Sequence, residues 1–251
     1  MIGKTIDRYK IIDKLGEGGM GSVWKAEDSK LNRLVALKSL SPHLAENEEA
    51  RERFIREAQA ASALNHPNIT TVHDLLDFND QHFICMEYVE GKTIRDFIES
   101  GRVGVEKAID IILQTAEALD TAHCKGILHR DVKSANIMVS AEGNVKIMDF
   151  GLAHLEERSQ LTRTGTTMGT LAYSSPEQLT GRPYDERSEI WSLGVVFYEL
   201  LAGQLPFMSS SEGELVYAII GYEQKPLGEL YNDLPEAVDY LVGRMLSKDL
   251  T

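Results

Sequence analysis

The chain has 251 residues, of which 43% are hydrophobic and 26% are charged. This length and composition allow a sizeable buried core and exclude a disordered or fibrous protein. The 26 basic and 39 acidic residues give a formal net charge of −13, which repels nucleic acid and anionic lipid. We therefore expect a globular protein with no nucleic acid partner.

The cysteines and the apolar segments bear on the compartment. Cys85 and Cys124 lie far apart and show neither disulfide-framework nor zinc-ligand spacing, which favours a reducing, cytoplasmic environment. The first residues lack the long apolar core of a secretory signal. The most apolar stretch, residues 190–203, is interrupted by Ser192 and Glu199. It predicts a buried helix, and no membrane contact is expected within this chain.

Short apolar runs with turn residues between them fill the part of the chain before residue 90 and predict successive antiparallel strands. The runs cover residues 9–12, 22–26, 33–38, 70–76 and 82–88. One helix is predicted among them, over residues 47–64, because apolar residues recur there at three- to four-residue spacing. Pro67 marks its end, since proline disfavours helix at the preceding residue.

Beyond Gly91 the hydrophobic period becomes helical, and helices are predicted over residues 105–123, 190–201 and 236–246. The first should bury one stripe, formed by Ala108, Ile109, Ile112, Leu113, Ala116 and Leu119. No repeat or flexible linker separates the two parts. We predict an α+β fold of two lobes, with an N-lobe at 1–86, a hinge at 87–91 and a C-lobe at 92–251.

Gly16, Gly18 and Gly21 form a GxGxxG motif, in which glycines let the backbone approach phosphate oxygens. Three interpretations remain open: a dinucleotide site followed by a helix, a glycine-rich flap between two strands, and a hairpin without a ligand. The β-like run at 23–26 favours the flap.

Lys38 ends the apolar run Val35-Ala36-Leu37 and can carry a positive charge to phosphates, provided that an acid holds it. Glu57, in the predicted helix, is the candidate acid. Taken singly, the two residues are also compatible with a solvated strand-end lysine and an ordinary helical glutamate.

Two later segments carry groups suited to phosphoryl transfer. Asp131 can accept a hydroxyl proton, and Lys133 can neutralise a transferring phosphoryl group. Asn136 and Asp149 offer the hard oxygen ligands that Mg²⁺ prefers. Each residue is ordinary when taken alone. The four motifs occur in a fixed order at compatible spacing, which makes a chance match very improbable.

In this order the motifs resemble the signature of the protein kinase family, and the roles that follow are those the resemblance implies. It rests on the glycine-rich loop, Val35-Ala36-Leu37-Lys38, Glu57, His129-Arg130-Asp131, Asn136, Asp149-Phe150-Gly151 and Ser175-Pro176-Glu177. Lys133 resembles the serine/threonine-specific version. Short segments such as His66-Pro67-Asn68 and Met86-Glu87-Tyr88 resemble those of the eukaryotic-like, receptor-like serine/threonine kinases of bacteria.

The resemblance implies a two-lobed kinase fold that binds ATP between its lobes and transfers the γ-phosphoryl group to proteins. Lys38, held by Glu57, would bind phosphates, and Asn136 with Asp149 would hold Mg²⁺, which Mn²⁺ can replace. Met86 would act as gatekeeper at the back of the adenine slot. The nucleotide contacts would be Leu15, Gly16, Gly18, Gly21, Val23, Ala36, Lys38, Met86, Glu87, Val89, Met138 and Met148.

The same resemblance assigns the transfer step and the substrate side. Asp131 would orient the acceptor hydroxyl and take its proton, and Lys133 would stabilise charge on the moving phosphoryl group. Thr170 would contact both residues beneath the protein substrate. Protein substrates with Ser or Thr acceptors are the expected partners, and homodimers are expected by analogy with the bacterial receptor-like enzymes.

A hydroxyl-rich segment between Asp149 and Pro176 suggests regulation. Phosphate there could pair with Arg130, which precedes Asp131, and order the loop. Thr162 and Thr164 are the predicted autophosphorylation sites, because their spacing ahead of Thr170 resembles that of bacterial relatives. The alternative is a polar loop without a switch.

Three positions depart from the family pattern. Ser134 replaces a proline, with some loss of loop rigidity. Glu189 replaces an aspartate whose carboxylate receives catalytic-loop N–H groups, and overpacking by the longer acid costs about 1–3 kcal/mol. The chain stops before the arginine that pairs with Glu177, so the end of the C-lobe is expected to be missing.

Two other functions stay open: a nucleotide-binding pseudokinase or scaffold without transfer, and a small-molecule kinase of similar shape. The competent residue types in the motifs argue against the first, and the loop containing Thr170 and Ser175-Pro176-Glu177 argues against the second. A membrane tether outside these residues is expected by resemblance to related bacterial enzymes.

Overall fold

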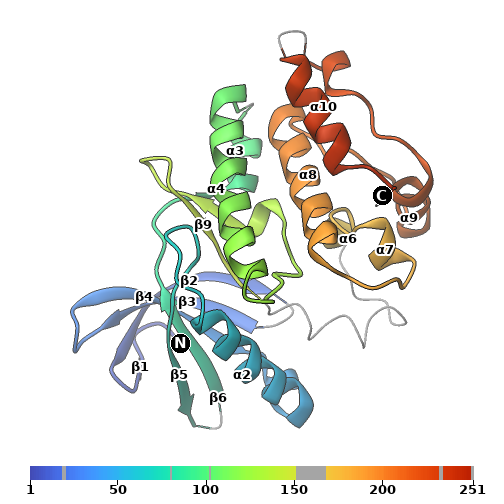
Figure 1. The fold of residues 1–251 in the computed structure, drawn as a ribbon. Coiled ribbons are helices and arrows are strands. Elements are labelled where there is room, and N and C mark those ends of the chain that lie inside the picture. Colours follow the sequence, from blue (N-terminus) through green and yellow to red (C-terminus); the bar gives the residue numbers. More distant parts are fainter. Residues whose placement is uncertain (19–20, 80, 102, 151–167, 232–233, 250–251) are drawn as a thin grey trace.

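The computed structural model describes the chain except for residues 19–20, 80, 102, 151–167, 232–233 and 250–251 and the side chains at 42, 53, 57 and 168. A strand-rich N-lobe and a mainly helical C-lobe lie one above the other, with the N-terminus in the first and the C-terminal end beside α9 in the second (Figure 1). The predicted two-lobed α+β fold is confirmed.

The described N-lobe residues form a six-stranded antiparallel sheet in the order β1-β2-β3-β4-β6-β5. Its strands are β1 (Thr5–Ile6), β2 (Tyr9–Gly18), β3 (Gly21–Asp28), β4 (Arg33–Leu40), β5 (Val72–Phe78) and β6 (Gln81–Glu87). Gly18 pairs with Gly21, so the glycine-rich segment joins two strands. Because a strand follows the motif, the dinucleotide-site interpretation is wrong.

One long helix packs on this sheet. After the short α1 (Pro42–Ala45), α2 spans Glu48–Ser62, and the side chain of Asn47 caps it by accepting the N–H of Ala50. Phe54 and Ala58 are buried against the β4 and β6 side chains in one apolar cluster. The predicted helix over 47–64 is therefore confirmed, and its apolar face explains why it lies against the sheet.

The C-lobe is built around one buried helix, α8 (Glu186–Ala202), which contacts α4 (Val105–His123) on one side and α10 (Glu236–Met245) on the other. Around it lie α3 (Ile94–Ser100), α6 (Met168–Leu171), α7 (Pro176–Leu179), α9 (Glu212–Gly221), η1 (Ser134–Asn136) and η2 (Leu227–Glu229). A small antiparallel sheet consists of β7 (Lys92–Thr93), β8 (Ile137–Val139) and β9 (Val145–Ile147). The three predicted C-lobe helices are confirmed.

No helix in the described ranges combines the length and the apolar character needed to cross a bilayer. The apolar stretch after residue 190 lies in α8, where its side chains are buried in the C-lobe core.

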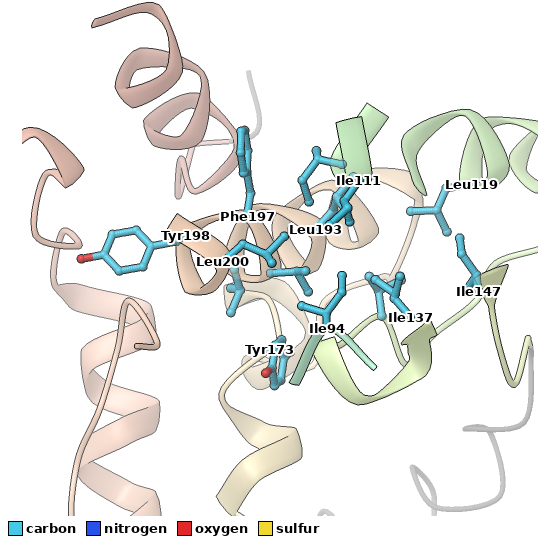
Figure 2. Packing of buried hydrophobic residues seen from close by; sticks show 14 of the residues in the cluster. Ile94, Ile111, Leu119, Ile137, Ile147, Tyr173, Leu193, Phe197, Tyr198 and Leu200 are labelled. Carbon is cyan, nitrogen blue, oxygen red and sulfur yellow. The ribbon is translucent and has the colours of Figure 1, made fainter. Parts of the chain in front are cut away.

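The predicted apolar stripe of α4 is partly wrong. The buried side is formed by Ala108, Ile111, Ile112, Thr115, Ala118, Leu119 and Ala122, whereas Ile109 and Leu113 are 38% and 56% exposed. Apolar residues occur on both sides of this helix, so spacing alone could not choose between them; contact with α8 and β9 does. Figure 2 shows Ile111 and Leu119 directed toward the packed interior.

Apolar packing and hydrogen bonds also join the two lobes. Ile69 of the N-lobe belongs to the same apolar cluster as Ile147 of β9, and their backbones form a parallel bridge. The Asn68 amide donates to the Val145 carbonyl at 2.8 Å and to Gln114 of α4 at 2.9 Å. These contacts tie the segment after α2 to the C-lobe.

Gly91 marks a close approach between the chain after β6 and the C-lobe. A Cβ placed on this residue would lie 2.5 Å from the carbonyl oxygen of Val139, which real Cβ atoms do not tolerate. Glycine is therefore required here by backbone packing.

Replacing Gly91 by alanine should lower the free energy of unfolding by about 1–3 kcal/mol, because the added methyl group pushes residue 91 away from β8. Urea unfolding followed by circular dichroism measures it. Gly213→Ala, in α9, is the matched control: a Cβ there meets nothing within 4 Å, and alanine favours helix over glycine. Equal stability of Gly91→Ala and the wild type would contradict the packing argument.

Candidate active site

The loop after α4 gathers the predicted transfer residues. A carboxylate oxygen of Asp131 lies 2.7 Å from the Lys133 ammonium nitrogen and accepts the Asn136 amide at 2.8 Å. Lys133 in turn donates to the hydroxyl of Thr170 at 3.3 Å. Four residues that the sequence separates by up to 39 positions thus form one hydrogen-bonded group. Of the two contacts that the resemblance implies for Thr170, the structure gives the one to Lys133.

The backbone of this loop is held in an uncommon conformation. Arg130 has a φ of 69°, in the left-handed region that costs a non-glycine residue about 1–3 kcal/mol. Its N–H donates to a carboxylate oxygen of Glu189 at 2.6 Å, and the Asp131 N–H donates to Nδ1 of His129 at 3.1 Å. These buried acceptors hold the strained turn that aims Asp131.

His129 joins the loop to the segment that carries Asp149. Since its Nδ1 accepts, its Nε2 carries the proton and donates to the Met148 carbonyl at 2.8 Å. The Met148 N–H donates to the Asn136 carbonyl at 2.8 Å, and the rings of His129 and Phe150 meet edge to face at 4.6 Å. Asp149, with a φ of 60°, is therefore fixed next to the Asp131 group.

Lys38 reaches this region from β4. Its ammonium lies 2.8 Å from a carboxylate oxygen of Asp149, and its side chain is 8% exposed. A buried ammonium needs such a partner, because desolvation without one is costly. The sequence offered Glu57 as that partner; the side chain of Glu57 lies outside the described structure, and the Lys38–Glu57 pair stays a prediction.

The predicted adenine slot is partly assembled from the N-lobe. Val23, Ala36 and Met86 belong to one apolar cluster, in which Ala36 and Met86 are buried. Leu15, in β2, is 46% exposed. Met86 also lines a cavity of about 20 Å³, together with Ala58, Ala61, Thr70, Val72, Ile84, Asp149 and Phe150. The gatekeeper role of Met86 stays a prediction.

The end of β6 carries Glu87, one of the residues predicted to contact adenine through its backbone. The Glu87 N–H donates to the Thr71 carbonyl at 2.9 Å, so an adenine contact from Glu87 has to use its carbonyl. Its carboxylate pairs with Lys146 of β9 at 2.7 Å, which the sequence analysis missed because the two residues are 59 positions apart. Val89 follows β6, Met138 lies in β8 and Met148 follows β9.

The three glycines of the GxGxxG motif differ in whether backbone packing requires a glycine. A Cβ on Gly21 would lie 1.8 Å from the Ser39 carbonyl oxygen, so contact with β4 explains this glycine. A Cβ on Gly16 or Gly18 meets nothing within 4 Å. Packing does not account for these two, and they suit a segment whose backbone approaches a phosphate group.

The donors also fit a divalent cation bound together with phosphates. Among the described residues no cluster of three or more His, Cys, Asp or Glu side chains could hold a metal alone. Mg²⁺ needs fewer protein ligands when phosphate and water complete its shell. Asp149 supplies a carboxylate oxygen. The amide nitrogen of Asn136 donates to Asp131, so the nitrogen end of this side chain is engaged there and its oxygen is the end that a cation would use.

Most of the predicted regulatory segment lies outside the residues that the structure describes. Thr162 and Thr164 belong to residues 151–167, which the structure does not describe. Arg130 is described and stands at the start of the Asp131 loop. The phosphorylation sites accordingly stay a prediction.

Glu189 is accommodated despite being longer than the aspartate of the family pattern. It is fully buried, and besides the Arg130 N–H it binds His123 at 2.6 Å and the Tyr184 hydroxyl at 3.0 Å. Burial alone would raise the pKa of Glu189, but the hydrogen bond from His123 and the nearby donors outweigh it and lower this pKa. The same hydrogen bond raises the pKa of His123.

Glu177, for which the resemblance supplies an arginine partner, is also buried. Its carboxylate accepts a hydrogen bond from the hydroxyl of Ser188 at the start of α8. This contact anchors α7 to the central helix within the described chain.

Comparison with known proteins places this geometry in a family. Residues 9–251 match the family described as the protein kinase domain. The chain belongs to the protein kinase family. This kinase domain is 41% identical over 251 residues to a probable serine/threonine-protein kinase of Clostridium perfringens, CPE1738, and 38% identical over 251 residues to the serine/threonine-protein kinase PrkC of Bacillus subtilis.

These relatives are longer than the kinase domain. The alignments cover 99% of this chain but only 37% and 39% of the two relatives. Among solved structures, the PknI kinase domain of Mycobacterium tuberculosis superposes with a TM-score of 0.76 at 30% identity, covering 99% of this chain and 91% of that one. Fold and family agree with the sequence-based prediction.

The His123–Glu189 pair makes stability depend on pH. Because the pKa of His123 is raised above its ordinary 6.5, its contribution is complete below that pH and is lost as the pH rises through the raised value. The pKa of Glu189 is lowered, so its contribution to stability is present at neutral pH and is lost as the pH falls through the lowered value. Wild type should thus exceed His123→Gln in free energy of unfolding most near about pH 6, and less toward about pH 9.

Urea unfolding at several pH values measures this difference. His43→Gln, at an exposed site in α1, is the control and should run parallel to the wild type. A constant difference between wild type and His123→Gln across this range would show that the pair does not titrate as its geometry requires.

Proposed function

We propose that this kinase domain transfers the γ-phosphoryl group of ATP to serine and threonine hydroxyls of proteins. The observation that carries the proposal is the hydrogen-bonded group of Asp131, Lys133, Asn136 and Thr170. It provides a base, a cation and an ordered loop at one point. Family membership supports the use of ATP and a divalent metal in general, and the residue roles are our proposal.

Each described side chain has a task that its surroundings allow. Asp131 is partly exposed, with 21% of its side chain accessible, so it can receive an acceptor hydroxyl and its proton. Lys133 stands beside it and can balance charge on the moving group. Asn136 and Asp149 would hold Mg²⁺, and the bound cation would neutralise phosphate charge. Lys38, next to Asp149, would hold the phosphates.

The preference for serine and threonine rests on the loop in front of the base. The contact of Lys133 with Thr170, which links the Asp131 loop to α6, supports this assignment. The relatives are named serine/threonine-protein kinases, which supports the same specificity. The kinase domain covers only part of their length, so the substrates of the whole protein stay proposals.

Asp131→Asn should reduce phosphoryl transfer to a peptide library about 10²–10⁴-fold, because the amide cannot take the hydroxyl proton. Transfer of labelled phosphate in Mg·ATP measures the rate. Asp110→Asn, at an exposed position of α4, is the control and should keep the wild-type rate.

Calorimetry with ATP separates the alternatives. Wild-type protein that binds ATP without transferring phosphate would contradict the proposal and support the pseudokinase or scaffold. Transfer to a small metabolite but not to any peptide would support a small-molecule kinase instead.

Autophosphorylation at Thr162 and Thr164 should activate the domain, since a phosphate carries close to two negative charges and can pair with Arg130. Mass spectrometry after incubation with Mg·ATP should find phosphate at these threonines, and Thr162→Ala/Thr164→Ala should lower peptide transfer. Absence of phosphate in residues 159–167 would refute the switch. A rate that rises with protein concentration would support transfer between two copies of the domain, as a homodimer requires.

The proposal also includes the lobe boundaries, with the N-lobe at 1–86, the hinge at 87–91 and the C-lobe at 92–251. It further includes a cytoplasmic location and a membrane tether outside this chain. Fractionation of the full-length protein tests the last two, since a tethered protein stays in the membrane pellet until detergent is added.

A further inference from the structure

Ser134 occupies the position at which the family pattern has proline. It begins η1, directly after Lys133, and is 1% exposed. Proline offers neither a hydroxyl nor an N–H, whereas serine places a hydroxyl in the interior, where it needs a partner. The structure supplies one: the Ser134 hydroxyl lies 2.7 Å from the hydroxyl of Tyr173.

Tyr173 belongs to the loop that would hold the protein substrate. It follows α6, and its N–H donates to the Thr170 carbonyl at 3.2 Å, so its position and that of Thr170 are coupled within one turn. The ring is 9% exposed and packs beside α8 and Ile94 (Figure 2). A hydroxyl of Ser192 in α8 also holds the Tyr173 carbonyl at 2.9 Å.

The chain of hydroxyls ends on a carboxylate. Tyr173 donates to an oxygen of Glu199 in α8 at 2.6 Å. Because the Tyr173 proton is used there, the Tyr173 oxygen can accept from Ser134, whose hydroxyl also faces the Glu199 carboxylate. Ser134, Tyr173 and Glu199 therefore form one buried hydrogen-bonded cluster. A side chain of the catalytic loop is thereby tied to the rigid central helix through the substrate loop.

We propose that Ser134 is a positioning residue for the protein substrate, which acts by locking Tyr173, and with it Thr170, against the catalytic loop. The inference rests on the proposed function and deepens it. The loops already meet through Lys133 and Thr170, at a distance of 3.3 Å and through a partly buried lysine that also pairs with Asp131. The Ser134–Tyr173 hydrogen bond adds a buried second point, and two points fix the orientation of the substrate loop where one does not.

The proposal predicts a split between the two substrates. Loss of the hydroxyl in Ser134→Ala should lower kcat/KM for a peptide by a factor of about 5–30, the range expected for one buried hydrogen bond. The KM for ATP should stay within about twofold, because Lys38 pairs with Asp149 and no described hydrogen bond links either residue to Ser134 or Tyr173. Tyr173→Phe should give a split in the same direction with a larger loss, because it also removes the Tyr173–Glu199 hydrogen bond.

A double-mutant cycle and two further variants test the mechanism. Ser134→Ala/Tyr173→Phe should be no worse than Tyr173→Phe alone, since Tyr173→Phe already lacks the Ser134–Tyr173 hydrogen bond. Ser134→Thr, which keeps a hydroxyl, should retain most peptide activity, and Ser134→Pro should behave like Ser134→Ala. Ser100→Ala, at an exposed serine at the end of α3, is the matched control. Thermal unfolding verifies that each variant is folded.

Hydrogen exchange supplies a readout that does not need transfer. Amides of residues 170–174 should exchange faster in Ser134→Ala and Tyr173→Phe than in the wild type, with α2 unchanged. Wild-type protein without any peptide transfer would refute the proposed function, while the exchange result still decides this inference. Unchanged exchange, wild-type peptide kinetics in Ser134→Pro, or an equal loss for ATP and peptide would overturn it.

Discussion

The buried carboxylate of Glu189 is the constraint on which the rest of the site depends. It projects from α8, the most deeply packed helix of the C-lobe, and accepts the N–H of Arg130 in the catalytic loop. That bond holds a left-handed backbone turn that would otherwise relax. Since the helix is rigid and the acceptor is fully desolvated, the position of Asp131 follows from the packing of the core.

From that anchor the site extends by short links between segments. His129 connects the loop to Met148 and Phe150, Asp149 reaches Lys38 across the lobes, and Lys133 reaches Thr170. Apart from the ring contact of His129 with Phe150, each link is a hydrogen bond or ion pair that is at least partly buried, where it is stronger than in water. The acidic net charge of −13 therefore says little about the site, in which two lysines create a local anion-binding field.

The motifs allowed most of the candidate site to be predicted, because phosphoryl transfer restricts both the residue types and their spacing. Partners that lie far apart in the sequence were less accessible. The Lys38–Asp149 ion pair was not predicted, and the predicted Lys38–Glu57 pair lies outside the described side chains. The pairs Glu87 with Lys146 and Ser134 with Tyr173 were missed, and the buried side of α4 was partly wrong, because both depend on what packs opposite.

The sequence by itself determined the alternation of strands and helices, the two-lobed fold and the identity of the groups able to perform the chemistry. Local periodicity and turn residues are sufficient for the first, and motif spacing for the last. Only the tertiary structure decided which acid holds which base, and how Ser134, Tyr173 and Glu199 join the substrate loop to the core. Those choices depend on distances across the fold, which no local pattern along the chain encodes.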